Sequence, residues 1–414
     1  MLPPFTLEQS LEKIVREEWG RILASLVKTL GDIQLAEDCL HDAVISAIKH
    51  WQKNGLPASP SAWLITTARR KAIDRLRKDK NFASKKDEIA YLLDLDNRSD
   101  EGDENAIIPD DRLEMIFTCC HPALEEKTRI ALTLRTLGGL STTEIASAFL
   151  DTPDAMQKRL TRAKKKIALT RIPYTIPDRD VLPERIFSVL RVLYLIFNEG
   201  YSAAGGESLT RTNLSDEAIR LARIVYQLLP AVTEAAGLLA LLLLHDSRRL
   251  ARADEDGEMI ALEDQNRARW DKTKIAEGTS ILEEVLPKAR IGPYQLQAAI
   301  SAVHAQSASW ALTDWPQIAT LYGLLYRIEP SPVVRINQAM AVSYASSPED
   351  GLTLLDETAA VRKLANYQPY FVARADLQTR IGKVSDAKRN LNTAIGLTEN
   401  KREKSFLIKK LHRL

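Results

Sequence analysis

Residues 140–166 read LSTTEIASAFLDTPDAMQKRLTRAKKK, and their spacing predicts two short helices joined by a tight turn. Ser141 and Glu144 have the spacing of a capping box, in which each side chain accepts a hydrogen bond from the other residue's backbone, so the first helix should begin directly after Ser141. Thr152 followed by Pro153 is a typical start for the second helix, with threonine as the N-cap. The two starts leave only a few residues for the turn, which predicts a helix-turn-helix motif.

The second helix of this motif has one apolar face and one basic face. Its apolar stripe consists of Met156, Leu160, Ala163 and Ile167. The short or basic side chains that should bind DNA are Ala155, Lys158, Arg159 and Arg162, followed by the phosphate-binding Lys164, Lys165 and Lys166. No acidic residue occurs between Ala155 and Arg171, so these side chains have no partner at helical spacing. A solvated helical hairpin is the alternative, but the charge pattern favours a helix that enters the major groove of DNA.

A second basic helix is predicted over residues 61–80, SAWLITTARRKAIDRLRKDK. Its apolar stripe consists of Ile65, Ala68, Ala72 and Leu76. The outward basic residues are Arg69, Arg70, Lys71, Arg75, Arg77 and Lys78. Such a surface suits a phosphate backbone, where each neutralised phosphate releases a counterion. Trp63, at the start of this helix, either stacks on an unpaired base or packs into the core.

An amphipathic helix is expected just upstream, over residues 35–49, with Glu37, Asp38 and Asp42 facing outward. Acidic helix faces are usually no more than solvated surface, so this feature by itself does not indicate a function.

Three blocks of the sequence together resemble a known family. They read AEDCLHDAVISAI (residues 36–48), PSAWLITTARRKAIDRLR (60–77) and LSTTEIASAFLDTPDAMQKRLTRAKKKI (140–167). In this order they resemble bacterial sigma factors of the extracytoplasmic-function (ECF) class in the sigma-70 family. The first two blocks are similar to sigma domain 2 and the third is similar to domain 4.

The resemblance implies an all-α protein that binds core RNA polymerase and promoter DNA and initiates transcription. Polymerase docking would use Glu37, Asp38 and Asp42 on the acidic helix. Contact with the minus-ten element would use Trp63, Arg69, Arg70, Lys71, Asp74, Arg75 and Arg77. Contact with the minus-thirty-five element would use Ala155, Lys158, Arg159, Arg162, Lys164 and Lys165. The residues at 154–158 differ from the commonest family pattern, so the promoter sequence does not carry over.

The same resemblance, together with composition, predicts the domain organisation. Domain 2 should cover residues 1–80, an acidic flexible linker 81–108, domain 4 residues 109–170, a proline-rich linker 171–183, and a helical extension 184–414. Near the end of the extension, residues 368–401 predict a tetratricopeptide-like (TPR-like) unit of 34 residues. Its small residues are Ala375, Gly382, Ala387 and Ala394, and a partial earlier copy has Ala341, Tyr344 and Ala360.

The middle of the chain resembles one ECF group that carries a large C-terminal helical extension. The similar segments are RVLYLIFNEGYSA (residues 191–203), LLALLLLHDSRRLAR (238–252) and LEDQNRARWD (262–271). In that group the extension is thought to regulate the sigma factor in place of a separate anti-sigma protein. The resemblance therefore implies control by the extension, which would bind an unknown ligand or protein.

Several other functions are not supported by the sequence. Cys119 and Cys120 are adjacent, without the gap typical of zinc sites, and the acidic residues around Asp254 lack calcium-loop spacing, so no metal is expected. No nucleophile–base arrangement or phosphate loop appears, so we expect neither an enzyme nor a cofactor. The apolar run 235–244 is too short to span a membrane and no leader is evident, which predicts a cytoplasmic protein without a membrane partner.

The charge balance also limits the possible functions. The chain has 57 basic and 55 acidic residues, a formal net charge of +2, so it is not a generally basic DNA-coating protein. Charge is segregated into basic and acidic segments instead. The main alternative is a helix-turn-helix transcriptional regulator with a TPR sensor domain that does not bind polymerase. An enzyme that uses the acidic residues near Asp254 is a weaker alternative.

Overall fold

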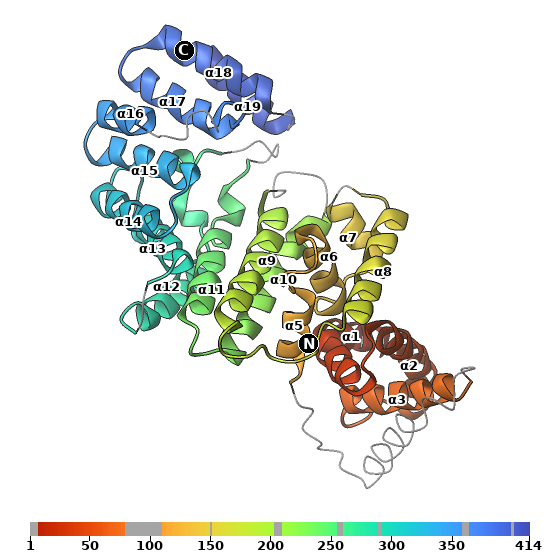
Figure 1. Ribbon diagram of the computed structural model, residues 1–414. Helices are drawn as coiled ribbons and strands as arrows, with labels where there is room; N and C mark the ends of the chain where they lie inside the picture. The colour runs from red at the N-terminus through yellow and green to blue at the C-terminus, as the bar shows by residue number, and fades with distance from the viewer. Residues whose placement is uncertain are drawn as a thin grey trace, which may run out of the picture. The chain divides into compact units, whose positions relative to one another are not determined.

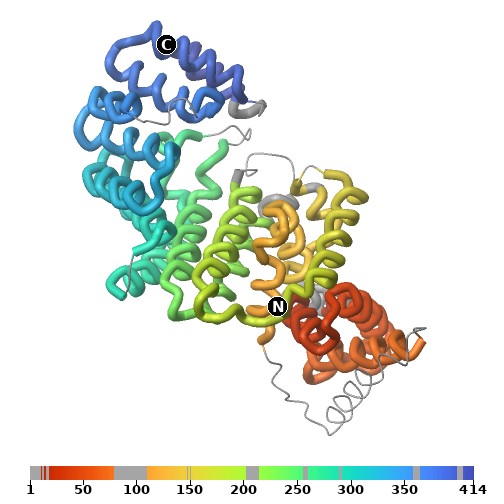
Figure 2. Tube along the Cα trace, in the orientation of Figure 1, coloured from red at the N-terminus to blue at the C-terminus, as the bar shows by residue number. Residues whose placement is uncertain are grey.

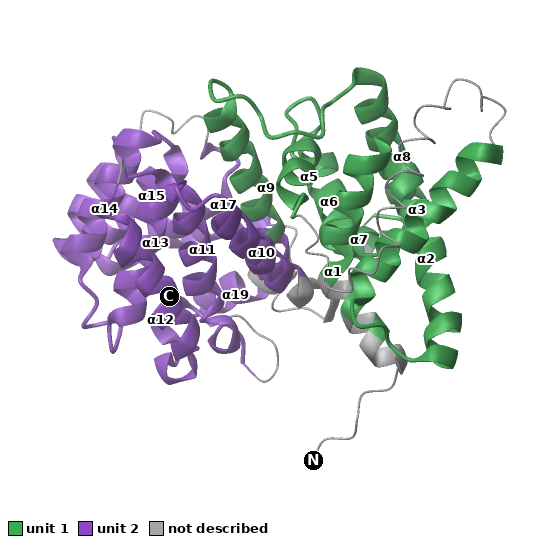
Figure 3. Ribbon diagram, turned by 90° about the horizontal axis from the view of Figure 1, so that it is seen from below, with its two compact units in different colours: residues 1–196 green, residues 197–414 purple. Residues whose placement is uncertain are grey.

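The computed structural model describes residues 7–78, 110–149, 151–202, 209–254, 260–288, 291–357, 364–398 and 401–414. Within these ranges the chain forms α-helices and short 3-10 helices with no β-strand, which confirms the expected all-α class (Figure 1). The expected acidic linker, residues 81–108, lies outside the described residues. The chain divides into two compact units, unit 1 (residues 1–196) and unit 2 (residues 197–414), coloured separately in Figure 3.

The first three helices of unit 1 pack against one another around a shared apolar core. They are α1 (Leu7–Leu30), α2 (Ile33–Asn54) and α3 (Pro60–Lys78). Asp32 begins α2, because its carboxylate accepts a hydrogen bond from the Leu35 backbone N–H at 2.9 Å. Trp51 near the end of α2 is fully buried. The stripe predicted for α3 is confirmed, since Ile65, Ala68, Ala72 and Leu76 are all buried.

Shorter helices follow in unit 1 and contain the helix-turn-helix. They are α5 (Arg112–Cys119), α6 (Glu126–Thr136), α7 (Thr142–Ala148) and α8 (Pro153–Thr170). The first turns of α9 (Leu182–Ser202) pack against them. Ser188 donates a hydrogen bond to the Cys120 carbonyl at 2.9 Å, and Arg185 donates to the Phe117 carbonyl at 2.6 Å. The boundary between the compact units therefore falls inside α9, whereas the sequence places the start of the extension at residue 184.

Unit 2 is a succession of helices that pack mainly against their neighbours in the chain (Figure 2). Its α-helices are α10 (Leu209–Leu228), α11 (Thr233–Asp246), α12 (Lys272–Val285), α13 (Pro293–Gln306), α14 (Trp315–Ile328), α15 (Pro332–Ala345), α16 (Pro348–Asp356), α17 (Gln368–Arg380), α18 (Val384–Leu397) and α19 (Lys401–His412). Its short 3-10 helices are η2 (Arg249–Ala251), η3 (Leu262–Asp264) and η4 (Arg267–Arg269). A proline lies at the start of each helix from α13 to α17, where its fixed φ suits the first turn.

The apolar run 235–244 forms most of α11, the central helix of its part of unit 2. Every residue in this run is buried, because α11 packs against α10, α12 and α13. A helix that is apolar all round needs such complete coverage. Among the described helices, none combines the length and the apolarity needed to cross a membrane.

The predicted repeat near the C-terminus corresponds to the helix pair α17 and α18. Gly382 lies between the two helices with a φ of 78°, a left-handed conformation that glycine adopts without strain. Ala375, Ala387 and Ala394 are fully buried, so these small side chains allow the helices to approach closely. Ala360 of the partial earlier copy lies outside the described residues.

Candidate nucleic-acid interface

The caps of the helix-turn-helix form as predicted. The Ser141 backbone N–H donates to the Glu144 carboxylate at 2.7 Å, and the Glu144 N–H donates to the Ser141 hydroxyl at 3.2 Å. The Thr152 hydroxyl accepts a hydrogen bond from the Ala155 N–H at 3.2 Å, and Pro153 begins α8. Because both helix starts are fixed by local side chains, the turn between them is defined by the sequence.

The two faces of α8 also follow the prediction. Met156, Leu160, Ala163 and Ile167 are buried. Lys158, Arg162 and Lys165 lie exposed on the other side of α8, while Ala155 is partly buried. Arg159 has no acidic partner at helical spacing within α8, as expected, but it forms a 3.0 Å ion pair with Asp151 in the turn before the helix.

The expected outward position of Glu37 is wrong, and the contact that buries it also engages Lys164. Glu37 was expected to face outward from α2, but its side chain is only 4% exposed. It forms ion pairs with Lys164 of α8 and with Arg135 of α6, whose Nε lies 2.5 Å from a Glu37 carboxylate oxygen. Lys164 is only 9% exposed and also donates to Gln34 at 3.0 Å, so in this structure it does not present its charge to DNA phosphates.

The Glu37 contact belongs to a larger seam between α1–α2 and the helices of the helix-turn-helix region. Lys28 of α1 lies 2.5 Å from the Asp111 carboxylate just before α5. A Cβ atom on Gly20 would lie 2.6 Å from the Leu137 carbonyl oxygen, so a side chain larger than glycine's would force the backbones apart. Burial by itself would raise the pKa of Glu37, but Arg135 and Lys164 outweigh it, and that pKa lies below its usual value.

Helices α2 and α3 form a groove with a volume of about 510 Å³. The residues that line it are Ser46, Lys49, His50, Lys53, Trp63, Thr67, Arg70, Lys71 and Asp74. Trp63 is half-buried, with its ring centroid 5.5 Å from His50 and 5.3 Å from Trp51, so it packs on the helices and still lines the groove. Lys49 and Lys53 extend the basic lining from α2. Neither lysine was predicted as a contact, although their spacing of four residues places both on one face of α2.

Arg75, expected to contact DNA, is held by the acidic residues of α2. It lies 2.6 Å from Asp42 and 3.3 Å from Asp38, and all three side chains are partly exposed. Asp38 and Asp42 therefore remain at the surface as expected, but their charge is shared with α3. Arg69 lies partly buried on α3, whereas Arg77 is exposed near its end.

The cysteines that raised the question of zinc are buried. The Cys119 sulfur lies 3.1 Å from the Thr136 hydroxyl, and burial raises the pKa of this thiol to about 12. Such a thiol stays protonated at neutral pH, whereas zinc binds the thiolate. Within the described ranges, no group of three or more His, Cys, Asp or Glu side chains could hold a metal ion.

Comparisons with known proteins cover most of the chain. The family model for Sigma-70 region 2 matches residues 14–82, and that for Sigma-70, region 4 matches residues 114–167. A family of unknown function, DUF6596, matches residues 185–286. An uncharacterized protein of Rhizobium meliloti (strain 1021) is 39% identical over 395 residues, which are 95% of this chain and 93% of the relative. No solved structure matches the chain.

Proposed function

The chain belongs to the sigma-70 family, as an ECF-like sigma factor with a C-terminal extension, and we propose that it binds core RNA polymerase and opens specific promoters. Its sigma-70 regions make it a factor of transcription initiation. We use the name domain 2 for α1–α3 and the name domain 4 for α5–α8.

The observation that best supports the proposal is the pair of basic surfaces on domain 2 and domain 4. Lys158 and Arg162 lie on a helix that is capped and buried on its other side, so they are available to base edges in a major groove. The groove beside Trp63 combines an aromatic ring with basic side chains, a combination that suits an unstacked base and its phosphates. One surface therefore suits duplex DNA and the other suits a melted strand.

Polymerase docking is assigned to the exposed part of the acidic face of α2. The side chains of Asp38 and Asp42 are 43% and 38% exposed, whereas the Glu37 carboxylate is buried in its ion pair with Lys164. We therefore place the first polymerase contact at Asp38 and Asp42. Glu37 and Lys164 can join the polymerase and DNA surfaces only after the seam between domains 2 and 4 opens.

The geometry of a promoter requires this seam to open. The minus-ten and minus-thirty-five elements lie at separate places along the DNA, so the groove beside Trp63 and the basic face of α8 must reach different sites at once. When the seam opens, both charges of the ion pair regain hydration, so opening costs less than the loss of about 3–5 kcal/mol that follows when one partner is removed and the other stays buried. Polymerase and DNA can then supply new partners for Glu37 and Lys164 and offset the remaining cost.

Control by the extension is the second part of the proposal. Its support is α9, a helix that begins in the packing of domain 4 and ends in unit 2. A truncation after Thr170 would remove Ser188 and Arg185 from the core of unit 1, so it would test folding as well as control. A truncation after Ser202 keeps these contacts, and a change in transcription would then report control by the extension.

The test begins with purified core RNA polymerase, the full-length protein and the promoter of its own operon. We expect a stable complex and a transcript that starts at a defined site. The double charge reversal Asp38→Lys with Asp42→Lys should weaken the complex, while Glu283→Lys, an exposed carboxylate of unit 2, should not. Binding to duplex DNA without polymerase binding or promoter opening would favour the regulator with a TPR sensor domain instead.

A further inference from the structure

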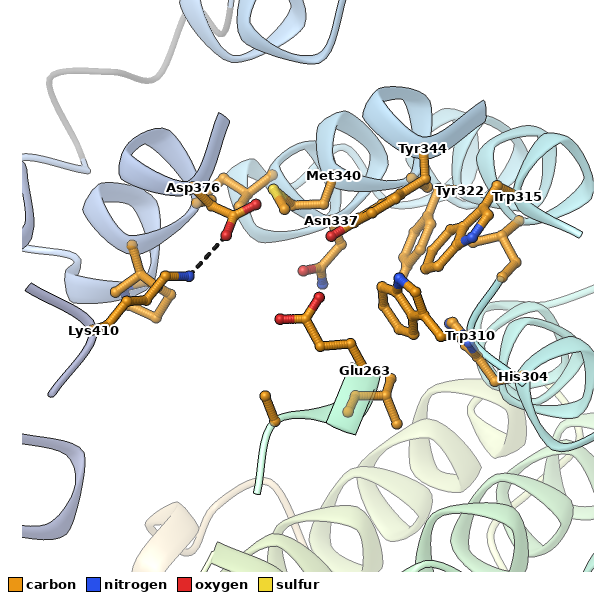
Figure 4. A pocket seen from close by; sticks show the side chains of 18 of the residues that line it. Glu263, His304, Trp310, Trp315, Tyr322, Asn337, Met340, Tyr344, Asp376 and Lys410 are labelled. Atoms are coloured by element: carbon orange, nitrogen blue, oxygen red, sulfur yellow. Dashed lines mark hydrogen bonds and ion pairs between the residues drawn. The ribbon is translucent and has the colours of Figure 1, made fainter. Parts of the chain in front are cut away.

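Unit 2 contains a cavity of about 480 Å³, which Figure 4 shows from close by. Its lining comes from η3, from the region of α13 to α15, and from α17 and α19. These segments are far apart in the sequence and all belong to unit 2. The cavity therefore forms only when these segments of unit 2 pack together.

One end of the cavity is an aromatic wall. The ring centroids of Trp310 and Trp315 are 4.5 Å apart, and Tyr344 lies 4.5 Å from Trp315 and 5.2 Å from Trp310. Mutual packing holds these rings in place, so their faces are preorganised. The Arg380 guanidinium lies 4.2 Å from the centroid of the Tyr344 ring, a cation–π contact that also helps to hold this ring in place.

Two carboxylates face the cavity from other segments. Glu263 of η3 projects into it, and within the described part of the chain it forms no ion pair (Figure 4). Asp376 of α17 binds Lys410 through one oxygen at 2.7 Å, while its other oxygen is buried and has no hydrogen-bond partner. Burial first, and then the charge of Asp376, raise the pKa of Glu263, which indicates that the two carboxylates repel each other across the cavity.

The remaining polar groups offset this negative charge only in part, because Lys410 and Arg380 lower the pKa of Glu263 by less than burial and Asp376 raise it. Lys410 is already paired with Asp376, and Asn337 is neutral. His304 lies beside the aromatic wall, and its Nδ1 is buried without a hydrogen-bond partner. Burial, together with Arg248 and Arg267, lowers the pKa of His304 to about 4, so the ring is neutral at neutral pH and does not repel a cation.

We propose that this cavity binds a small organic cation, with its ammonium group between Glu263 and Asp376 and its apolar body against Trp310, Trp315 and Tyr344. An ammonium group would separate the two carboxylates and provide the missing partner for the second Asp376 oxygen. An anion would face two carboxylates and no free basic partner within the described lining, and a neutral apolar molecule would leave Glu263 and Asp376 without compensation. Small organic cations are the ligands for which aromatic rings and carboxylates are commonly combined.

The test uses full-length protein and three probes that share a phenylethyl body. Phenethylamine is a cation at neutral pH, 2-phenylethanol is neutral, and 3-phenylpropionate is an anion. Isothermal titration calorimetry at millimolar probe concentrations should show phenethylamine binding about tenfold more tightly than the alcohol, because only the ammonium group can pair with Glu263 and with the second Asp376 oxygen. Binding is measured without polymerase or promoter, so this result is independent of the proposed function.

Variants then locate the site. Glu263→Gln should reduce the preference for the cation and leave binding of the alcohol unchanged, because η3 is exposed at this residue and the substitution keeps its shape. Glu283→Gln, on an exposed face of α12 outside the cavity, is the matched control. Thermal unfolding of each variant reports whether the fold is intact. Equal binding of the three probes, preference for the anion, no binding of any probe, or an unchanged preference in Glu263→Gln would each overturn the proposal.

Discussion

Two buried carboxylates, one in each unit, are held by similar ion pairs but have different roles. Glu37 in unit 1 pairs with Arg135 and Lys164, and its side chain is 4% exposed. Asp246 in unit 2 is fully buried and lies 2.6 Å from Arg249 and 2.5 Å from Lys274. In each case one carboxylate neutralises two basic side chains.

The difference lies in what the pairs connect. Asp246, at the end of α11, joins η2 and the start of α12, neighbours that share one core. Glu37 joins domain 2 to side chains of domain 4 that follow it by 98 and 127 residues. A buried ion pair inside one core therefore stabilises the fold, whereas the same chemistry at a seam between two domains forms a contact that can open.

The largest effect is expected at Asp246. Asp246→Ala removes a fully buried carboxylate and leaves Arg249 and Lys274, which are 23% and 30% exposed, without their shared partner, so unit 2 should lose about 3 kcal/mol in its free energy of unfolding. Urea unfolding followed by hydrogen exchange in α11 and α12 measures this loss. Asp216→Asn is the matched control, because Asp216 also pairs with Arg249 but is 55% exposed, and it should cost less than about 1 kcal/mol.

A smaller loss, with a different signature, is expected at Glu37. Glu37→Gln should weaken the seam by about 1–3 kcal/mol, less than at Asp246, because Arg135 and Lys164 can reach water once the domains separate. Hydrogen exchange should increase along the facing parts of α1, α6 and α8, while the core of α2 and α3 stays protected. Asp38→Asn, at an exposed carboxylate on the same helix, should change neither the stability of the seam nor this hydrogen exchange. Global unfolding of unit 1 by Glu37→Gln would show that the contact belongs to one indivisible core.

Acid should affect unit 2 and the seam of unit 1 at different pH values. Burial, and then nearby arginines, lower the pKa of His245 to about 3 and that of His304 to about 4. The unfolded chain binds protons below about pH 6.5 while these folded rings stay neutral, so the stability of unit 2 falls as pH drops from 7 to 5, by at most about 2 kcal/mol per histidine.

The seam should respond only to stronger acid. The pKa of Glu37 is lowered in the folded protein, so its contribution is present above its unfolded pKa and is lost as pH falls through the folded value. Hydrogen exchange at pH 7 and pH 5 should therefore show weaker protection in α11 and α13 but an unchanged seam. His245→Gln and His304→Gln should flatten the response of unit 2. Loss of hydrogen-exchange protection at the seam at pH 5, with α11 still protected, would contradict this pH dependence.

The smallest effect on stability is expected for the exposed pair on domain 2. Arg75→Ala removes the contacts with Asp38 and Asp42, but all three side chains are about 40% exposed, so it should change the free energy of unfolding by less than about 1 kcal/mol. Thermal unfolding measures this change, with Arg77→Ala as the control. A loss similar to that of Asp246→Ala would show that exposure is a poor guide to the strength of these pairs.

Much of the candidate interface could be predicted because its determinants are local. The capping box at Ser141, the N-cap at Thr152 and the buried stripe of α8 depend on neighbours within about one helical turn. The burial of Glu37 also had a local signal, since it follows Ile33 by four residues and precedes Leu40 by three, and both are buried. The acidic character of the residue obscured its position on the apolar face.

The sequence by itself determined the helices, their caps, the all-α class and the residues that form the basic faces, because backbone hydrogen bonds and helical periodicity act over a few residues. Only the tertiary structure decided which charges remain available. It paired Lys164 with Glu37 and Arg75 with Asp42, and it brought Glu263 and Asp376 to one cavity. The physical reason is that an ion pair between distant segments depends on how whole helices pack, and no local spacing encodes that distance.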